Sequence, residues 1–158
     1  MQSIASSEFL QFLVAAKQAT YAGQSDTATL APLLPGSKQL EFAQGRFLYR
    51  DVYVGMVRFV GQEIVYCDGE PVWSMSYAGG LLPQASPAAA PGVYAFLRRA
   101  LRALPPKFPI RGPALLEAEG LCYACQHTGT MDAFQGDETV SEAGAPVYAL
   151  HFAGGRLV

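Results

Sequence analysis

Residues 61–80 read GQEIVYCDGEPVWSMSYAGG, and residues 136–155 read GDETVSEAGAPVYALHFAGG. The two stretches align without a gap at an offset of 75 residues, and nine of their twenty positions are identical. Average composition predicts roughly one or two identities by chance. The large apolar residues Trp73, Met75 and Tyr77 align with other large apolar residues. The alignment therefore predicts two copies of one structural unit.

The first of these stretches contains the clearest hairpin signal in the chain. Asp68-Gly69 separates two strand-like runs, Gln62–Cys67 and Pro71–Tyr77, and such a dipeptide is typical of a tight turn between antiparallel strands. Within the second run, large apolar residues alternate with Ser74 and Ser76. This alternation predicts an antiparallel strand with one buried face.

Two helices are expected outside the strands. Ser6 or Ser7 is a suitable N-cap for the first, and an apolar stripe follows from Phe9 to Ala16. A long loop is expected over Gln24–Lys38. The second helix begins near Pro91, a residue favoured in the first turn, and stops before Pro105-Pro106. The other strands are predicted at Leu40–Gln44, Arg46–Val54, Leu115–Glu119, Leu121–His127, Asp137–Glu142 and Val147–Phe152, with turns at Gly120, around Gly129–Gly136 and at Ala143-Gly144.

These elements predict the α+β fold class. We expect two tandem repeats, each a helix followed by four antiparallel strands, related by a pseudo-twofold axis, with the helices covering one side of the sheet or sheets. The chain of 158 residues is expected to be a single domain over 1–158. Repeat one covers 6–80, a linker covers 81–90 and repeat two covers 91–155.

Composition limits the classes of partner. Half of the chain is hydrophobic and only 15% is charged, well below the usual quarter. This favours a large core or a self-association face, so a homodimer is one expectation. The net charge of -2 provides no electrostatic footprint for nucleic acid and no polybasic patch for a membrane.

The compartment expected from the sequence is the cytoplasm. The first residues lack the pattern of a signal peptide, and no apolar run approaches the roughly 18–20 residues that span a bilayer. Three cysteines, Cys67, Cys122 and Cys125, are an odd number, which does not suit a closed disulfide framework.

Several runs together resemble a known family: FLQFLVAAKQATYAG at 9–23, PGSKQLEF at 35–42, FLYRDVYVG at 47–55, GQEIVYCDGEPVW at 61–73 and GAPVYALHFAGG at 144–155. The chain resembles a family of uncharacterised bacterial proteins labelled only as a domain of unknown function, found alone or behind an XRE-type helix-turn-helix. No helix-turn-helix is evident in this sequence. The resemblance implies a sensing or partner-binding role and carries over no catalytic residue.

Cys122-x-x-Cys125-x-His127 is the one motif that suggests a metal. On a strand, however, Cys122 and Cys125 point to opposite faces, and the second cysteine pair of a zinc ribbon is absent. Buried cysteines without a metal are the favoured interpretation, and no metal or cofactor is predicted.

Glu63 and Glu138 occupy equivalent Gly-x-Glu positions of the two copies. If an axis runs near those strand starts, they form a carboxylate pair that shares a proton or binds a cation. The alternative, which we favour, is that each satisfies a local backbone group or pairs with an arginine. Arg50 and Arg58 are the candidates.

A polar and aromatic strand face carries Tyr49, Asp51 and Tyr53. Together with the equivalent face of the second copy, it would line a pocket for a small amphipathic ligand. The alternative is that the tyrosines are core residues with hydroxyls at the rim. The equivalent residues are Tyr123, Cys125 and His127.

The leading hypothesis is a non-enzymatic domain that binds a small ligand or a protein partner, with any site between the two repeats. One alternative is a small hydrolase or isomerase that uses carboxylates as acid and base. Another is a structural dimerisation module. No catalytic set is predicted, and the expected ligand-binding residues are Tyr49, Asp51, Tyr53, Glu63, Tyr123, His127 and Glu138.

Overall fold

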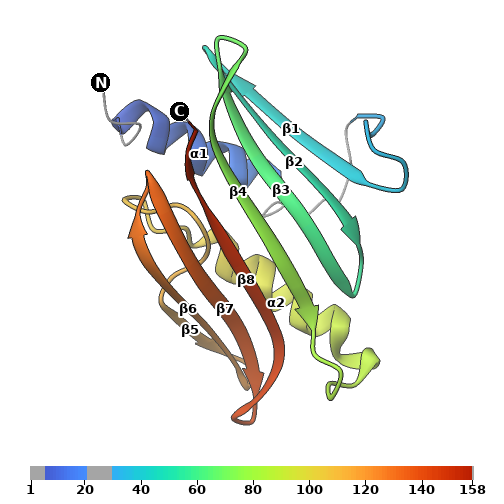
Figure 1. Ribbon diagram of the computed structural model, residues 1–158. Helices are drawn as coiled ribbons and strands as arrows, with labels where there is room; N and C mark the ends of the chain where they lie inside the picture. The colour runs from blue at the N-terminus through green and yellow to red at the C-terminus, as the bar shows by residue number, and fades with distance from the viewer. Residues whose placement is uncertain (1–5, 21–29, 158) are drawn as a thin grey trace.

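The computed structural model describes residues 6–20 and 30–157. All eight strands of this part of the chain form one antiparallel sheet in the order β1-β2-β3-β4-β8-β7-β6-β5. Figure 1 shows β4 beside β8 in the middle of the sheet and both helices on one face. The strands are β1 Lys38–Gln44, β2 Phe47–Gly55, β3 Arg58–Cys67, β4 Glu70–Leu81, β5 Leu115–Ala118, β6 Leu121–Thr130, β7 Ala133–Glu142 and β8 Ala145–Arg156.

The α+β class is confirmed, but the prediction of two tandem helix-plus-four-strand repeats is wrong. β4 hydrogen-bonds to β8 from Trp73↔Arg156 to Leu81↔Tyr148, so the strands make one continuous sheet. The helices also do not serve separate halves. Lys17 of the first helix donates a hydrogen bond to the carbonyl of Ile110 at 2.6 Å, and Tyr94 of the second packs on Phe59 of β3. The sheet and both helices therefore share one core.

The first helix, α1 (Ser7–Ala19), begins as the capping pattern predicts. The Ser6 side chain accepts a hydrogen bond from the backbone N–H of Phe9 at 3.3 Å, and this satisfies one of the free donors of the first turn. The stripe from Phe9 to Ala16 is buried. Lys17 lies on the same face and is buried as well, with no exposed surface, although lysines are almost never fully buried unless they are paired.

The second helix, α2 (Ala90–Arg102), follows a short 3-10 helix, η1 (Pro87–Ala89). Its apolar stripe faces the sheet, and Val93, Leu97 and Leu101 are buried. The Tyr94 hydroxyl donates to the carbonyl of Val57 and accepts from the N–H of Leu81 at 3.2 Å. These bonds fix the helix against the β2–β3 turn.

The turn predicted around Gly129–Gly136 is shorter than expected. β6 runs to Thr130 and β7 starts at Ala133, which leaves only Met131 and Asp132 between them. Gly136 lies within β7, where an added Cβ would sit 2.4 Å from the Phe152 ring. The residue marks a close approach of a ring to the backbone and not a turn.

The long loop expected over Gln24–Lys38 falls partly outside the described residues. From Leu30 to Ser37 the chain has no helix or strand, and β1 begins at Lys38. In the described ranges, neither helix is long and apolar enough to cross a membrane.

The core is built around Trp73, which is completely buried. Its indole N–H donates to the carbonyl of Met131 at 3.2 Å. The ring stacks on Phe134 at 5.7 Å and meets Phe9 of α1 at 6.3 Å. The residue therefore connects β4 to β7 and to α1, and its polar atom is satisfied.

Gly61 is the position where a methyl group should be most disruptive to the site described below. An added Cβ would lie 2.4 Å from the Tyr77 hydroxyl and 2.7 Å from the Tyr53 Cβ. We expect Gly61→Ala to destabilise the fold by about 1–3 kcal/mol through overpacking, measured by urea unfolding. Gly92 of α2 has nothing within 4 Å of an added Cβ, so Gly92→Ala is the control and should be neutral or stabilising. Equal losses in both variants would contradict this account of Gly61.

Candidate functional site

Several charged side chains are buried beneath the helices. Charged groups are seldom fully buried unless they are paired or hydrogen-bonded, so each requires an explanation. Each exposes 5% or less of its surface; the acids are Asp51, Glu63 and Glu138, and the bases are Lys17 and Arg111.

Glu138 on β7 is fully satisfied. Arg111 donates to both of its carboxylate oxygens, with Nε at 2.9 Å from Oε2. The hydroxyls of Tyr123 and Tyr148 donate to the same carboxylate at 2.8 Å each. Burial, followed by the charge of Glu138, raises the pKa of both phenols, so they remain protonated donors. The cluster is a neutral and saturated anchor for the segment that follows α2.

Neither carboxylate oxygen of Glu63 on β3 accepts a hydrogen bond from the described residues, but one of them lies in an ion pair. Its Oε2 lies 2.8 Å from Lys17 Nζ, and both side chains are fully buried. Burial lowers the pKa of Lys17, while the charge of Glu63 opposes that change. In the described part of the chain, the other oxygen, Oε1, has no hydrogen-bond donor. A buried acceptor without a donor costs roughly 1–3 kcal/mol.

Asp51 on β2 lies directly opposite Glu63 in the sheet. Its Oδ1 accepts a hydrogen bond from the Tyr77 hydroxyl at 2.7 Å. Burial first, and the neighbouring charge of Glu63 second, raise the pKa of Asp51 to about 7. Asp51 therefore exchanges a proton with solvent near neutral pH, unlike an ordinary aspartate.

These two carboxylates line a cavity of about 410 Å³ between α2 and the strands β2 and β3. The inner end is formed by the buried side chains of Asp51, Glu63, Tyr77 and Arg111. Aliphatic and aromatic side chains make the wall, and half-buried or exposed residues surround the opening. The wall includes Phe59, Leu97 and Leu101, and the opening includes Lys38, Met56, Val57, Pro91 and Arg98.

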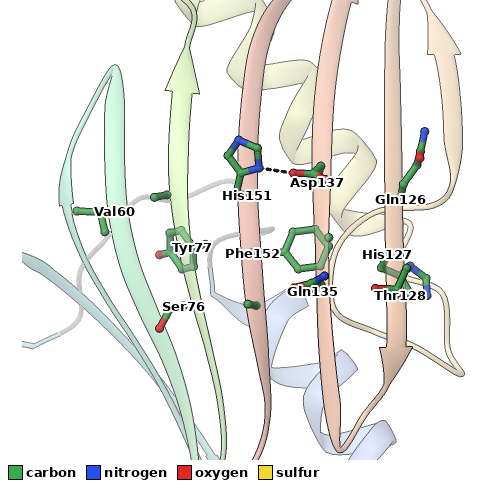
Figure 2. A pocket seen from close by; sticks show the side chains of 13 residues that line it. Val60, Ser76, Tyr77, Gln126, His127, Thr128, Gln135, Asp137, His151 and Phe152 are labelled. Atoms are coloured by element: carbon green, nitrogen blue, oxygen red, sulfur yellow. Dashed lines mark hydrogen bonds and ion pairs between the residues drawn. The ribbon is translucent and has the colours of Figure 1, made fainter.

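A second, more open groove of about 680 Å³ crosses the sheet face that the helices leave uncovered. Its floor carries small residues, among them Ser76 and Ala153. Figure 2 shows His151 and Asp137 pointing toward each other from β8 and β7 across this groove. Their side chains are 81% and 60% exposed, and such solvated pairs contribute little binding energy. The cavity beneath α2 is the stronger candidate site.

The expected ligand-binding residues are divided among several places. Asp51, Tyr53 and Glu63 line the cavity beneath α2. Tyr49 is a fully buried core residue. His127 stacks on Phe108 at 4.1 Å and borders the open groove on the uncovered face.

The other two expected residues, Tyr123 and Glu138, belong to the Arg111 cluster. A direct Glu63–Glu138 pair does not form, because β4 and β8 separate their strands by about 14 Å in total. The alternative interpretation, in which a glutamate pairs with an arginine, is correct for Glu138. Its partner is Arg111 and neither of the expected candidates. Arg50 pairs with Glu41, and Arg58 donates to the carbonyl of Leu81.

Four residues of the site were missed by sequence reasoning: Lys17, Tyr77, Arg111 and Tyr148. Lys17 follows Leu13 by four residues, so it lies on the buried face of α1, and this spacing was an available signal. Tyr77 was expected only as a packing residue. Arg111 lies in an irregular segment rich in proline and glycine, and no periodicity indicates its partner.

The cysteine motif does not form a cluster. Cys125 is buried, Cys122 is partly buried, and both thiols are free. Burial raises the pKa of Cys125 to about 11, so this thiol is protonated and a poor metal ligand at neutral pH.

A family model matches the part of the chain that supplies every lining residue of the cavity except Lys38. The family described as Domain of unknown function (DUF5680) matches residues 51–157, which is more than half of the chain. The chain belongs to this family. No curated protein and no solved structure matches it. The match to the DUF5680 domain includes Asp51, Glu63, Arg111 and Glu138, but not Lys17.

The buried Lys17–Glu63 pair should be essential for the stability of this protein. Lys17→Met leaves a buried carboxylate without its cation and is expected to cost about 3–5 kcal/mol in urea unfolding. Adding Glu63→Gln should restore most of that loss, because the uncompensated charge disappears. The control is Arg46→Met, which breaks an exposed pair with Asp68 and should cost less than about 1 kcal/mol. Additive losses for Lys17→Met and Glu63→Gln would contradict the coupling.

Asp51 should make stability depend on pH. Because its folded pKa is raised to about 7 from 3.8, the folded state keeps a proton that the unfolded state releases, and stability falls as pH rises between these values. Asp51→Asn keeps an acceptor for Tyr77 and removes this ionisation. Its stability relative to wild type should increase from pH 4 to pH 8, by at most about 4 kcal/mol.

The matched control for this variant is Asp137→Asn, which removes an acid that is 60% exposed. Urea unfolding curves at several pH values measure the effect. Parallel pH profiles for Asp51→Asn and wild type would show that Asp51 titrates as an ordinary aspartate.

Proposed function

We propose that this DUF5680 domain binds a small amphipathic molecule in the cavity beneath α2. The polar end of the ligand donates hydrogen bonds to Asp51 and Glu63. One observation supports this assignment above all: Glu63 lines the cavity, and its buried Oε1 has no donor among the described residues. A ligand donor at this oxygen removes an otherwise uncompensated desolvation cost.

The rest of the cavity supports an amphipathic ligand. Phe59 of β3 and Leu97 and Leu101 of α2 provide an apolar wall. A mostly apolar concavity with a few convergent polar groups is the usual form of a small-molecule site. Its volume of about 410 Å³ suits a small metabolite and excludes a folded partner.

Acid–base catalysis is the second candidate function, and the raised pKa of Asp51 favours it. A carboxyl group with a pKa of about 7 can both accept and donate a proton at neutral pH. One observation opposes catalysis: Glu63 and Glu138 are each held in an ion pair. Neither of them is therefore available as a second acid or base beside Asp51. If the bound molecule is turned over, Asp51→Asn should lower kcat by about 10²–10⁴.

The broader setting is also a proposal. A cytoplasmic location fits three free cysteines, since reducing compartments keep thiols unpaired. A bacterial origin rests on the family resemblance alone. The association with XRE-type helix-turn-helix segments that the resemblance implies would make the cavity a sensing site. In that case ligand binding would be reported to an attached or separate regulator.

Filling the cavity tests the proposal. Ala90 lines the cavity and Ala95 is exposed on the same helix, so Ala90→Phe and Ala95→Phe are matched variants. In NMR titrations with n-hexanol and n-hexylamine, we expect wild type and Ala95→Phe to show shifts at cavity-lining residues. Ala90→Phe should lose most of these shifts.

Two results would overturn the assignment. One is that neither probe shifts a cavity-lining residue in the wild-type domain. The other is that Ala90→Phe binds both probes as well as Ala95→Phe does, while its spectrum remains that of a folded protein.

A further inference from the structure

The buried charges beneath the helices do not balance. Asp51, Glu63 and Glu138 carry three negative charges when ionised, and Lys17 and Arg111 carry two positive charges. Arg111 binds Glu138 through two hydrogen bonds, and Lys17 binds Glu63. Within residues 6–20 and 30–157, Asp51 has a hydrogen bond from the neutral hydroxyl of Tyr77 and no ion pair of its own, although the charges of Lys17 and Arg111 act on it. The inner end of the cavity therefore has one carboxylate without a counter-cation.

The opening of the cavity has the opposite charge. Lys38 of β1 and Arg98 of α2 both line it and are half-buried, whereas the acids are almost completely buried. Lys38 lies 5.8 Å from the centre of the Tyr53 ring, which holds its ammonium group beside the cavity. No acidic side chain lines the opening among the described residues. Charge along the cavity thus runs from negative inside to positive outside.

We infer that the molecule bound in this cavity is a small zwitterion, with a cationic amine at Asp51 and Glu63, an apolar middle under α2, and an anionic group at Lys38 and Arg98. This inference rests on the proposed function and specifies its ligand. An ammonium group has three donors. It can therefore satisfy Glu63 Oε1 and the charge of Asp51 at once, which a neutral hydroxyl cannot do.

The apolar middle follows from the wall between the two charged ends. Phe59, Leu97 and Leu101 offer no hydrogen-bonding side chain, so a polar linker would lose its hydration there without compensation. A methylene chain or ring between the amine and the acid fits instead. The class is that of amino acids and amino carboxylates whose charged groups are separated by an apolar segment.

Binding of the amine should be linked to a proton. The groups that face Asp51 are Glu63 from β3, Tyr77 from β4, Lys17 from α1 and Arg111 from the segment before β5. The burial of Asp51 and the negative charge of Glu63 both favour the protonated form of Asp51. A cationic ligand favours the ionised acid, so it should displace the proton. Affinity for an amine should therefore rise as pH increases from 5 to 8.

The test compares three probes with one carbon skeleton: ε-aminocaproate, n-hexylamine and hexanoate. Calorimetry and NMR titration of the whole domain measure their affinities. We expect ε-aminocaproate to bind most tightly. Its affinity should exceed that of hexanoate roughly tenfold or more, since a charge-assisted hydrogen bond contributes about 1.5–3 kcal/mol. Calorimetry in two buffers at pH 6 should detect release of up to one proton when either amine binds.

Three variants identify the two ends of the ligand. Arg98→Gln should reduce the affinity for ε-aminocaproate toward that for hexylamine, and leave hexylamine unchanged. Arg99→Gln is the matched control, because Arg99 is the next residue of α2, pairs with Glu119 and does not line the cavity. Asp51→Asn should weaken both amines and abolish proton release, with little effect on hexanoate.

The outcomes separate this inference from the proposed function. If hexanoate binds in the cavity as tightly as ε-aminocaproate, or if Arg98→Gln and Arg99→Gln behave alike, the zwitterion is excluded while the binding site stands. If none of the three probes, nor n-hexanol, shifts any cavity-lining residue, both the site and its ligand class are rejected.

Discussion

Two nearly completely buried carboxylates that face each other across neighbouring strands are the constraint on which this structure depends. Asp51 and Glu63 are opposite residues of β2 and β3, and like charges in that position repel. Lys17 neutralises only one of them. The proton on Asp51, the position of α1 and the polarity of the cavity all follow from this pair.

The ion pairs also explain how segments distant in sequence come together. Lys17 lies on α1 and Glu63 on β3, and the same ammonium group reaches the carbonyl of Ile110. Arg111, the next residue, binds Glu138 on β7. Breaking either pair would leave a charge in the core, so α1 and the segment after α2 are held in one arrangement. That arrangement leaves the cavity between α2 and the sheet.

Much of the local structure could be predicted from the sequence, because it depends on neighbours along the chain. The Ser6 cap, the stripe from Phe9 to Ala16 and the Asp68-Gly69 turn are local signals, and each was predicted correctly. The joining of β4 to β8 was not predictable in the same way. Alternation along a strand specifies which face is buried, but not which other strand lies beside it. For this reason the tandem-repeat architecture was wrong while its elements were largely right.

The site was predictable only in part, for a related reason. Asp51 and Glu63 were expected from their strand positions, and both line the cavity. Their cationic neighbours were not expected, because Lys17 and Arg111 come from a helix and an irregular segment far away in the chain. The partner of a buried charge is fixed by tertiary packing. Sequence spacing identifies that a carboxylate is buried, but not what compensates it.

Stability alone does not account for the Asp51–Glu63 pair. An apolar pair of similar volume is often as stable as a buried ion pair, and sometimes more stable. A neutral amide at position 51 would still accept the hydrogen bond from Tyr77 without the repulsion. The Glu138 cluster shows how this same fold satisfies a buried acid completely, with one arginine and two tyrosines. The fold therefore does not require the incomplete pairing at Asp51 and Glu63. Destabilising arrangements that persist in folded proteins are typical of functional sites, and we attribute this one to the cavity.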